Sequence, residues 1–424
     1  MAARRLAISV LRQVLEEHRA LDEALAAHAD LERLAARDRA FARLLIATSL
    51  RRLPEIDAIL KGFLSWPLPA KANEARWVLR LGAVQILLLK TPAHAAVSTS
   101  LALLEGRMAG FKGLANAVLR KLGRDARPLA SPDAARLNTP DWLWQSWSDA
   151  YGEATALAIA EQHLENPPLD LTVPDEPAGW ADRLGGTLLP QGGLRLRSAG
   201  DPQALAGYAD GAWWVQDQAA ALPVLLFPDL RGRRIADLCA APGGKTLQLA
   251  AAGAQVTALD LSEERLARVH ENLARCGLEA RLQPGDACDW QPPEPLDAVL
   301  LDAPCSATGT LRRHPDIARN RRQADVESLL PLQARLLRAA VAMLRPGGVL
   351  IYTVCSLQPE EGAQQIEALL AESKAVRRLA ISAEELAGHA EMIDVHGALR
   401  TLPCHLAEAG GMDGFYAARL ERLA

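Results

Sequence analysis

The fold is decided by the stretch Ile235-Ala-Asp-Leu-Cys-Ala-Ala-Pro-Gly-Gly-Lys-Thr246, in which a short apolar run leads into a glycine turn. The run has the length of a buried strand, and a helical pattern begins after the turn. Similar apolar runs follow at 256–259, 296–301 and 349–354, with helical patterns between them. This alternation predicts a doubly wound parallel sheet, so residues 226–424 are expected to form an α/β Rossmann-like domain.

Two familiar nucleotide-binding motifs do not fit the glycine turn. Gly244-Lys-Thr246 resembles the end of a phosphate-binding P-loop, but Cys239 stands where that loop needs its first glycine. The G-x-G-x-x-G fingerprint of dinucleotide-binding proteins is not met either. The turn therefore predicts another ligand, held close to the backbone at the carboxyl edge of the sheet.

Acidic residues after the next two strands indicate the class of that ligand. Gly243 and Gly244 let a ligand approach the backbone, and the helix N-terminus behind them favours a carboxylate. Asp260 can bond both hydroxyls of a ribose, and Asp286 is expected near an adenine. A nucleoside with a carboxylate tail and no phosphates describes S-adenosylmethionine. The alternative is that these acids only cap helices and form turns.

Two cysteines follow the ends of two later strands. One strand runs into Leu301-Asp-Ala-Pro-Cys-Ser306 and the next into Tyr352-Thr-Val-Cys-Ser356. Because parallel strands end at one edge, Cys305 and Cys355 are expected to lie together beside the methyl donor. Either cysteine alone would more often be a buried filler, but two at one edge predict reactive groups.

The first part of the chain differs in pattern and charge. Residues 1–128 show helical periodicity almost throughout and predict an all-α domain. Residues 1–130 hold 21 Lys and Arg against 12 Asp and Glu, whereas the whole chain has a net charge of −4. Such a basic module is typical of an arm that contacts a phosphate backbone, although a solvated helical surface has the same composition. Residues 129–225, rich in proline, are expected to form a small mixed linker and RNA-binding subdomain.

Several motifs together resemble those of the RNA cytosine-C5 methyltransferases, and the bacterial 16S ribosomal RNA enzymes of the Sun/RsmB type in particular. The N-terminal part of the chain resembles the NusB-like helical RNA-binding module that these enzymes carry. The resemblance covers essentially the whole chain. The motifs are Asp237–Lys245, Asp302–Ser306, Cys355-Ser356, Ala307–Ile317, Arg37–Arg43, Lys112–Arg120 and Asp413–Tyr416.

The resemblance implies a fold, a reaction and the residues that carry it out. The fold is that of a class I methyltransferase, and the reaction transfers a methyl group from S-adenosylmethionine to carbon 5 of a cytosine in 16S ribosomal RNA, cytosine 967 in the usual numbering. Cys355 would be the nucleophile, Cys305 would assist product release, and Asp302 would bond the N3/N4 edge of the base. The cofactor-binding residues implied are Cys239, Ala240, Ala241, Pro242, Gly243, Gly244, Lys245, Asp260, Arg265, Asp286 and Asp302.

Three local features bear on this resemblance. Val354 stands directly before the second cysteine, where the family usually has threonine. Thr172-Val-Pro174 replaces a frequent Arg-Val-Asn, which weakens the expectation of an RNA contact there. A basic run begins shortly after Cys305 and is predicted to contact RNA phosphates rather than to be a merely solvated surface. Its members are Arg312, Arg313, Arg319, Arg321 and Arg322.

Composition argues against several other classes of protein. The most apolar run, residues 81–89, is far too short to cross a bilayer, and the six cysteines form no C-x-x-C pair. We therefore expect a cytoplasmic monomer without metal, membrane or DNA as a partner. Two alternatives remain open: the same chemistry on transfer RNA, and a non-catalytic RNA-binding assembly factor that keeps the fold.

Overall fold

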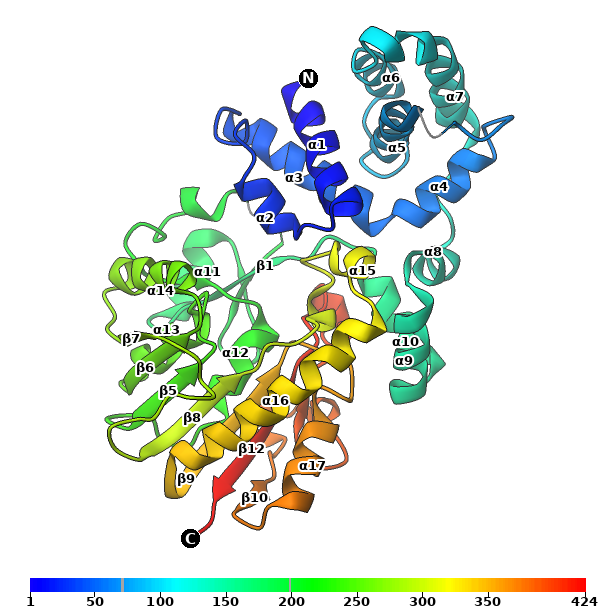
Figure 1. Ribbon diagram of the computed structural model, residues 1–424. Helices are drawn as coiled ribbons and strands as arrows, with labels where there is room; N and C mark the ends of the chain where they lie inside the picture. The colour runs from blue at the N-terminus through cyan, green and yellow to red at the C-terminus, as the bar shows by residue number, and fades with distance from the viewer. Residues whose placement is uncertain (70–71, 198–199) are drawn as a thin grey trace. The chain divides into compact units, whose positions relative to one another are not determined.

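The computed structural model describes the chain except at positions 70–71 and 198–199, and the described residues form two compact units (Figure 1). The helical unit comprises residues 1–166 together with residues 311–321, and the rest of the described chain forms the sheet unit. The division into domains at 1–128, 129–225 and 226–424 stays a prediction. The helical unit takes up a short segment from the middle of the sequence of the sheet unit.

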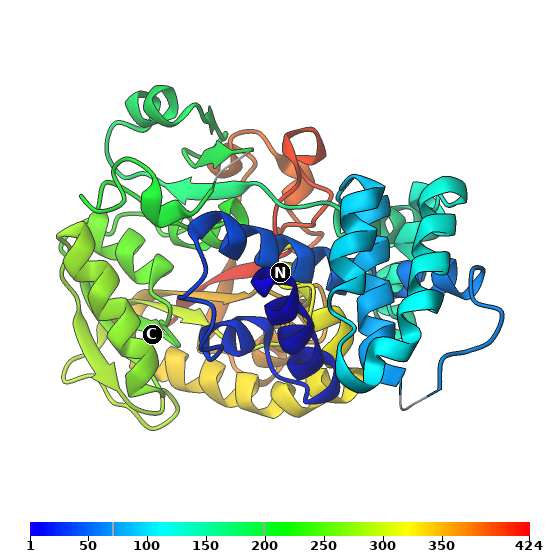
Figure 2. The ribbon, with the colours of Figure 1, turned by 90° about the horizontal axis from the view of Figure 1, so that it is seen from above.

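The helical unit confirms the all-α prediction for the N-terminal part of the chain. Its helices α5, α6 and α7 pack against one another (Figures 1 and 2). The α-helices that lie wholly before residue 167 are α1 (Ala2–Glu16), α2 (Leu21–Ala26), α3 (Ala36–Arg51), α4 (Leu53–Lys61), α5 (Asn73–Leu87), α6 (Ala93–Leu101), α7 (Lys112–Asp125), α8 (Ser131–Asn138), α9 (Asp141–Tyr151) and α10 (Glu153–Gln162).

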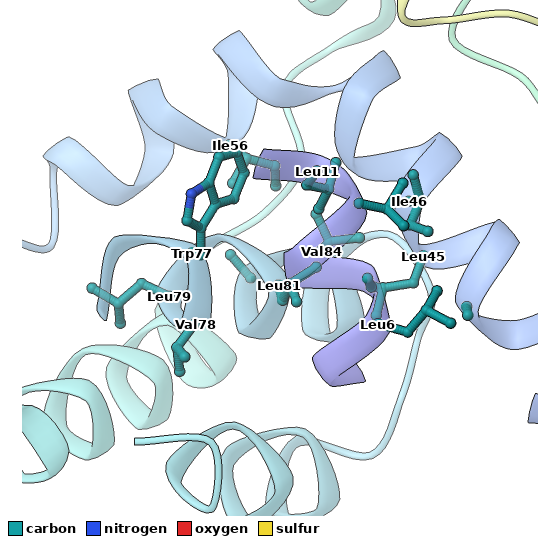
Figure 3. Close-up of a cluster of buried hydrophobic side chains, with 14 of the residues drawn as sticks. Leu6, Leu11, Leu45, Ile46, Ile56, Trp77, Val78, Leu79, Leu81 and Val84 are labelled. Carbon is teal, nitrogen blue, oxygen red and sulfur yellow. The ribbon is translucent and has the colours of Figure 1, made fainter. Parts of the chain in front are cut away.

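An apolar core holds these helices together. Leu6 and Leu11 lie on one face of α1 because buried positions recur every three or four residues along it. They pack in one cluster with Leu45 and Ile46 of α3 and with Trp77 of α5 (Figure 3). All five side chains are buried, so burial of apolar surface is the main stabilising term of this unit.

Residues 311–321, which include α15 (Ile317–Asn320), are built into the helical unit by polar contacts. The Asp316 carboxylate accepts the N–H of Leu21 at 3.0 Å, at the start of α2. Arg51 donates to the carbonyl of Arg312 at 2.7 Å. The segment therefore supplies partners that the helical unit needs for its own backbone and side chains.

The same segment corrects one expectation about the basic run. Arg312 is only 1% exposed, which contradicts its predicted contact with RNA phosphates. Arg319 donates to the carbonyls of Leu50 at 3.2 Å and Asn138 at 2.7 Å, and burial lowers its pKa to about 10. These arginines serve the packing of the helical unit, a role that the sequence pattern does not distinguish from RNA binding.

The sheet unit begins with a small antiparallel sheet in the order β2-β3-β1-β4. Trp213 and Trp214, at its last strand, are buried and belong to the core. This part has the mixed character expected for the linker. Its elements are β1 (Leu169–Thr172), α11 (Pro177–Leu184), β2 (Thr187–Leu188), β3 (Leu194–Leu196) and β4 (Trp214–Val215).

The main sheet confirms the doubly wound α/β prediction. Its strand order is β10-β12-β9-β8-β5-β6-β7, with β11 paired to β12. The pairs from β9 to β7 are parallel, and β12 runs antiparallel to both β9 and β10. The strands are β5 (Arg234–Leu238), β6 (Gln255–Asp260), β7 (Arg281–Pro284), β8 (Leu296–Asp302), β9 (Leu344–Val354), β10 (Val376–Leu379), β11 (Leu399–Arg400) and β12 (Tyr416–Arg422).

Helices cover both faces of this sheet because successive strand residues point to opposite sides. Val299 and Leu301 share a core with α16 (Gln323–Met343) and α17 (Ala363–Glu372). Leu300, between them, shares the other core with α12 (Gln218–Leu225) and α13 (Gly244–Ala251). The order of strands reverses between β5 and β8, and the carboxyl edge at such a point is where doubly wound sheets bind ligands.

We predict that Asp316→Ala loosens the start of α2. The substitution leaves the Leu21 N–H without its carboxylate acceptor, and loss of such a capping contact typically costs about 1 kcal/mol. Amide hydrogen exchange of the full chain should then be about fivefold faster at Leu21, while amides of α9 keep their rates. An unchanged exchange rate at Leu21 would contradict the role given to Asp316.

Candidate active site

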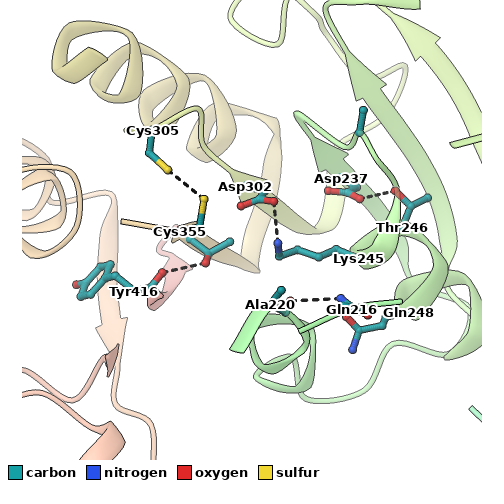
Figure 4. Close-up of polar contacts among 12 residues, drawn as sticks. Gln216, Ala220, Asp237, Lys245, Thr246, Gln248, Asp302, Cys305, Cys355 and Tyr416 are labelled. Atoms are coloured by element: carbon teal, nitrogen blue, oxygen red, sulfur yellow. Dashed lines mark hydrogen bonds and ion pairs between the residues drawn. The ribbon is translucent and has the colours of Figure 1, made fainter. Parts of the chain in front are cut away.

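Two sulfur atoms meet at the carboxyl edge of the main sheet. β8 ends at Asp302 and β9 ends at Val354, and their parallel pairing sets the residues that follow side by side. The Sγ atoms of Cys305 and Cys355 lie 3.5 Å apart (Figure 4). The structure thus brings together the two cysteines that the sequence places after separate strands.

A partly buried ion pair lies at the same edge. The Lys245 ammonium bonds the Asp302 carboxylate at 2.7 Å and lies 5.1 Å from the centre of the Phe415 ring (Figure 4). Burial by itself lowers the pKa of Lys245, but the charge and hydrogen bond of Asp302 outweigh burial and raise that pKa. The negative charge of a Cys355 thiolate acts in the same direction. Lys245 therefore stays protonated and keeps its positive charge at this edge of the sheet.

Cys305 is in a different electrostatic position from its neighbour. Its hydrogen bond to Cys355 and its burial raise the pKa of the Cys305 thiol well above the usual value, and the buried Glu361 carboxylate adds to this effect. The Cys305 thiol therefore holds its proton at neutral pH.

The glycine turn connects β5 to α13 through a backbone that only glycine adopts easily. Gly243 has φ +103°, and a Cβ there would lie 3.1 Å from a methyl group of Val269. Gly243 directly precedes α13, so the helix N-terminus faces the turn as expected. Ala240 and Ala241 line the turn and are buried. Cys239 is half-buried, and desolvation raises the pKa of its thiol to about 12, so this side chain stays protonated at neutral pH.

Asp260 organises the ends of β6 and of the glycine turn. One carboxylate oxygen accepts the N–H of Ala241 at 3.1 Å, and the other accepts the N–H of Ser262 at 3.1 Å. Arg265 lies 3.4 Å from this carboxylate and donates to the carbonyl of Ala241 at 2.8 Å. The capping role considered above is therefore present, and each oxygen still has a second lone pair for a ligand hydroxyl.

Asp286 follows β7, as expected from the sequence. Its carboxylate accepts the N–H of Cys288 at 2.8 Å, and the preceding residue, Gly285, donates its N–H to the carbonyl of Asp260 at 3.0 Å. The turn that carries Asp286 is thus tied to the end of β6. The structure places both acids at the carboxyl edge that holds the glycine turn.

Some residues of this edge were missed by the sequence reasoning. Asp237 is fully buried, accepts the hydroxyl of Thr246 at 2.6 Å, and has no partner for its other oxygen among the described residues. Glu361 is also fully buried and bonds Ser306 and Ser356, which follow the two cysteines. The repeated Cys-Ser pair was a signal for the serines, whereas no pattern in the sequence marks Glu361.

The two departures from the family pattern have local explanations. Val354 is buried in the sheet core, and the hydroxyl of Thr353 donates to the carbonyl of Tyr416 at 2.9 Å. Thr172 ends β1 and bonds the side chain of Gln216 at 2.8 Å. Neither residue replaces a group of the candidate site.

A groove of about 820 Å³ lies at the opposite, amino-terminal edge of the sheet, and none of the candidate residues lines it. Among the described residues, no group of three or more His, Cys, Asp or Glu side chains is arranged to hold a metal ion. None of the described helices combines the length and apolar character that crossing a bilayer requires.

Comparison with protein families gives two matches that together span most of the chain. Residues 224–421 match the family described as 16S rRNA methyltransferase RsmB/F. Residues 1–124 match the NusB family. The first match contains the candidate site, and the second covers most of the helical unit.

Individual proteins give a consistent result. The chain is 36% identical over 396 residues to ribosomal RNA small subunit methyltransferase B of Klebsiella pneumoniae, covering 87% of this chain and 89% of that protein. It is 35% identical over 445 residues to the protein of that name from Pseudomonas syringae pv. tomato, covering 100% and 98%. A solved structure, PH0851, is similar with a TM-score of 0.76 over 99% of this chain and 98% of that one. Its sequence identity is 21%, so this likeness concerns the fold.

We predict that Asp237 makes the stability of the protein depend on pH. Burial raises the pKa of Asp237 to about 7, so the folded protein keeps a proton that the unfolded chain, with its ordinary value of 3.8, releases at lower pH. The stability of the wild type should therefore fall as pH rises from about 4 to about 7, by up to about 4 kcal/mol relative to Asp237→Asn. Urea denaturation of both proteins across this range measures the difference, with Asp210→Asn at an exposed site as the control. Parallel curves for wild type and Asp237→Asn would rule out the effect.

Proposed function

The chain belongs to the 16S rRNA methyltransferase RsmB/F family, and from this premise we propose that it methylates carbon 5 of a cytosine in 16S ribosomal RNA through a covalent cysteine adduct. By resemblance to the family, the target is cytosine 967. The observation that carries the proposal is the pair of sulfur atoms 3.5 Å apart beside the Lys245–Asp302 ion pair.

S-adenosylmethionine is the cofactor of this methyltransferase family, and when bound it supplies an electrophilic methyl group. We propose that the glycine turn and the two acids after β6 and β7 hold it. The α13 N-terminus suits its carboxylate, the free lone pairs of Asp260 suit its ribose hydroxyls, and Asp286 suits its base. Backbone and side chains of Cys239, Ala240, Ala241, Pro242, Gly243, Gly244, Lys245, Arg265 and Asp302 complete the proposed surroundings.

The chemistry needs a nucleophile because carbon 5 of cytosine does not take a methyl group unaided. The thiolate of Cys355 adds to carbon 6, which breaks the conjugation of the ring and makes carbon 5 enamine-like. Asp302 bonds the N3/N4 edge and stabilises the adduct with N3 protonated. After carbon 5 has taken the methyl group, a base such as solvent water removes the proton of carbon 5. The electron pair of that C–H bond forms the double bond between carbons 5 and 6, Cys355 leaves as a thiolate, and N3 gives up its proton, which restores the aromatic ring.

The electrostatics of Cys305 support the division of roles between the two cysteines. A cysteine attacks as its thiolate, so the attacking sulfur must lose its proton. Cys305 holds its proton at neutral pH, which suits a group that acts later, during release of the product, rather than one that attacks the base. A DNA cytosine methyltransferase would carry its nucleophile in the Pro-Cys motif, at the position of Cys305.

The helical unit is proposed to hold the RNA. Its N-terminal residues match the NusB family, and residues 1–130 carry the excess of basic side chains. Basic side chains that neutralise phosphates bind RNA without selecting a particular base. The target cytosine must be unstacked for Cys355 to reach carbon 6 from above the ring. We propose a monomeric cytoplasmic enzyme with ribosomal RNA as its partner.

We predict opposite outcomes for substitution of the two cysteines. Cys355→Ser should lower methyl transfer to unmodified 16S RNA by at least about a thousandfold, because the hydroxyl is a far weaker nucleophile. Cys305→Ala should form the adduct with RNA but release it slowly, so that a protein–RNA band accumulates on a denaturing gel. Labelled donor and peptide mapping of the band measure both effects, and Cys276→Ala is the control for cysteine loss.

Three results would count against the proposal. Full turnover by Cys355→Ser would exclude it as the nucleophile. Transfer of label to transfer RNA instead of 16S RNA would change the substrate. No transfer by the wild type to any RNA would indicate a binding or assembly factor.

A further inference from the structure

Two loops carry the sulfur atoms, and buried polar side chains join them. The Cys305 loop comprises residues 303–310 after β8, and the Cys355 loop comprises residues 355–362 after β9. Polar side chains inside a protein need hydrogen-bonding partners, and here the partners come from the opposite loop. The joining side chains, all with 0% exposure, are Ser306, Thr308, Ser356, Gln358 and Glu361.

Glu361 is the centre of this network. One of its carboxylate oxygens accepts the N–H of Ser306 at 2.8 Å and the side-chain amide of Gln333 at 3.1 Å. The other accepts the hydroxyl of Ser306 at 2.5 Å and the hydroxyl of Ser356. A single buried carboxylate therefore binds the residue directly after each cysteine. Charge-assisted bonds of this kind are among the stronger hydrogen bonds in proteins.

A second set of contacts fixes the loops further along the chain. Thr308 donates to the side chain of Gln358 at 2.9 Å and accepts the N–H of Leu357 at 3.0 Å. The N–H of Gly309 donates to the carbonyl of Cys355 at 3.0 Å. A Cβ at Gly309 would lie 1.8 Å from the carbonyl oxygen of Gly414, so this approach requires glycine. These contacts hold the backbones of the two loops together, and Glu361 adds bonds to the residue directly after each cysteine.

We propose that Glu361 is a positioning residue that sets the distance and orientation between the Cys305 and Cys355 sulfur atoms. The inference rests on the proposed function, in which one sulfur attacks the base and the other assists its release. Glu361 is fully buried, and its bonds go to the serines and Gln333 rather than to either sulfur. It acts through Ser356 on the attacking group and through Ser306 on the releasing group.

Two substitutions at Glu361 separate hydrogen bonding from charge. Glu361→Gln keeps the size of the side chain, and its amide can donate to the two serine hydroxyls while its oxygen accepts from Ser306 N–H and Gln333. Glu361→Ala removes the carboxylate that accepts from all four donors, and leaves the Ser306 N–H without its acceptor. We expect adduct formation with 5-fluorocytosine-containing RNA to slow at least about tenfold in the alanine variant and to stay within about threefold of wild type in the glutamine variant. S-adenosylmethionine affinity should stay within about twofold in both.

The matched control for this experiment is Glu55→Ala in the helical unit. Glu55 is also a fully buried glutamate, and it accepts bonds from Arg52, Asn138 and the N–H of Leu129. Its loss should destabilise the fold in a comparable way without changing the rate of adduct formation at saturating RNA. Equal slowing in Glu55→Ala and Glu361→Ala would overturn the positioning role, as would a wild-type rate in Glu361→Ala.

Substitutions of the two serines should slow different steps of the reaction. Ser356→Ala should slow adduct formation, because it frees the loop of the attacking sulfur. Ser306→Ala should form the adduct at a near wild-type rate but release the product slowly, so that the adduct accumulates on RNA with ordinary cytosine. Identical effects of both substitutions on both steps would mean that the network is only a structural support and would overturn the proposal.

A measurement without RNA keeps this test separate from the proposed function. Diamide accepts two electrons and two protons from a pair of thiols and leaves a disulfide, at a rate that depends on how well the two sulfurs are aligned. Peptide mapping of the Cys305–Cys355 disulfide should show slower formation in Glu361→Ala than in wild type, Glu361→Gln and Glu55→Ala. Equal rates would refute the positioning role. Absence of any adduct in the wild type, with the expected order of disulfide rates, would instead refute the proposed function alone.

Discussion

The parallel hydrogen bonding between β8 and β9 is the constraint on which the site depends. The strands pair with Asp302 opposite Thr353, and the N–H of Ala303 donates to the carbonyl of Thr353 at 2.9 Å, one residue beyond the end of β8. The chain therefore leaves both strands at the same height, and Cys305 and Cys355 come within reach of each other. A shift of one residue in this pairing would turn the side chains of β9 to the opposite face of the sheet.

The sheet unit places charged groups where burial is costly. Asp237 and Glu361 are fully buried, and Lys245 is nearly so. Each has a local partner: Thr246 bonds one oxygen of Asp237, Asp302 pairs with Lys245, and hydroxyl and amide groups bond Glu361. Burial of the apolar layers on both faces of the sheet offsets the cost of burying these groups. The bonds of Lys245 and Glu361 favour fixed positions for the groups around the two cysteines.

The sequence predicted the positions of site residues that directly follow strands. It did not predict the roles of residues that depend on how loops and side chains pack. Apolar runs and the glycine turn predicted the doubly wound sheet and the meeting of the two cysteines, because a parallel sheet leaves few choices for where strand ends lie. Glu361 could not be found, since its role depends on how the loop after β9 folds back. The basic run was misjudged at Arg312, which is buried, for a similar reason: a buried arginine and one that binds phosphate look alike in sequence.

The segment 311–321 has a consequence for how this chain could evolve. It is encoded inside the sheet unit but completes the helical unit, where Asp316 bonds the backbone of Leu21. A single genetic crossover between two related enzymes, placed between the units, would join a helical unit from one parent to this segment from the other. Natural recombination should therefore preserve the two parts as a co-inherited set. Exchange of the helical unit would require matched changes at two separated places in the gene.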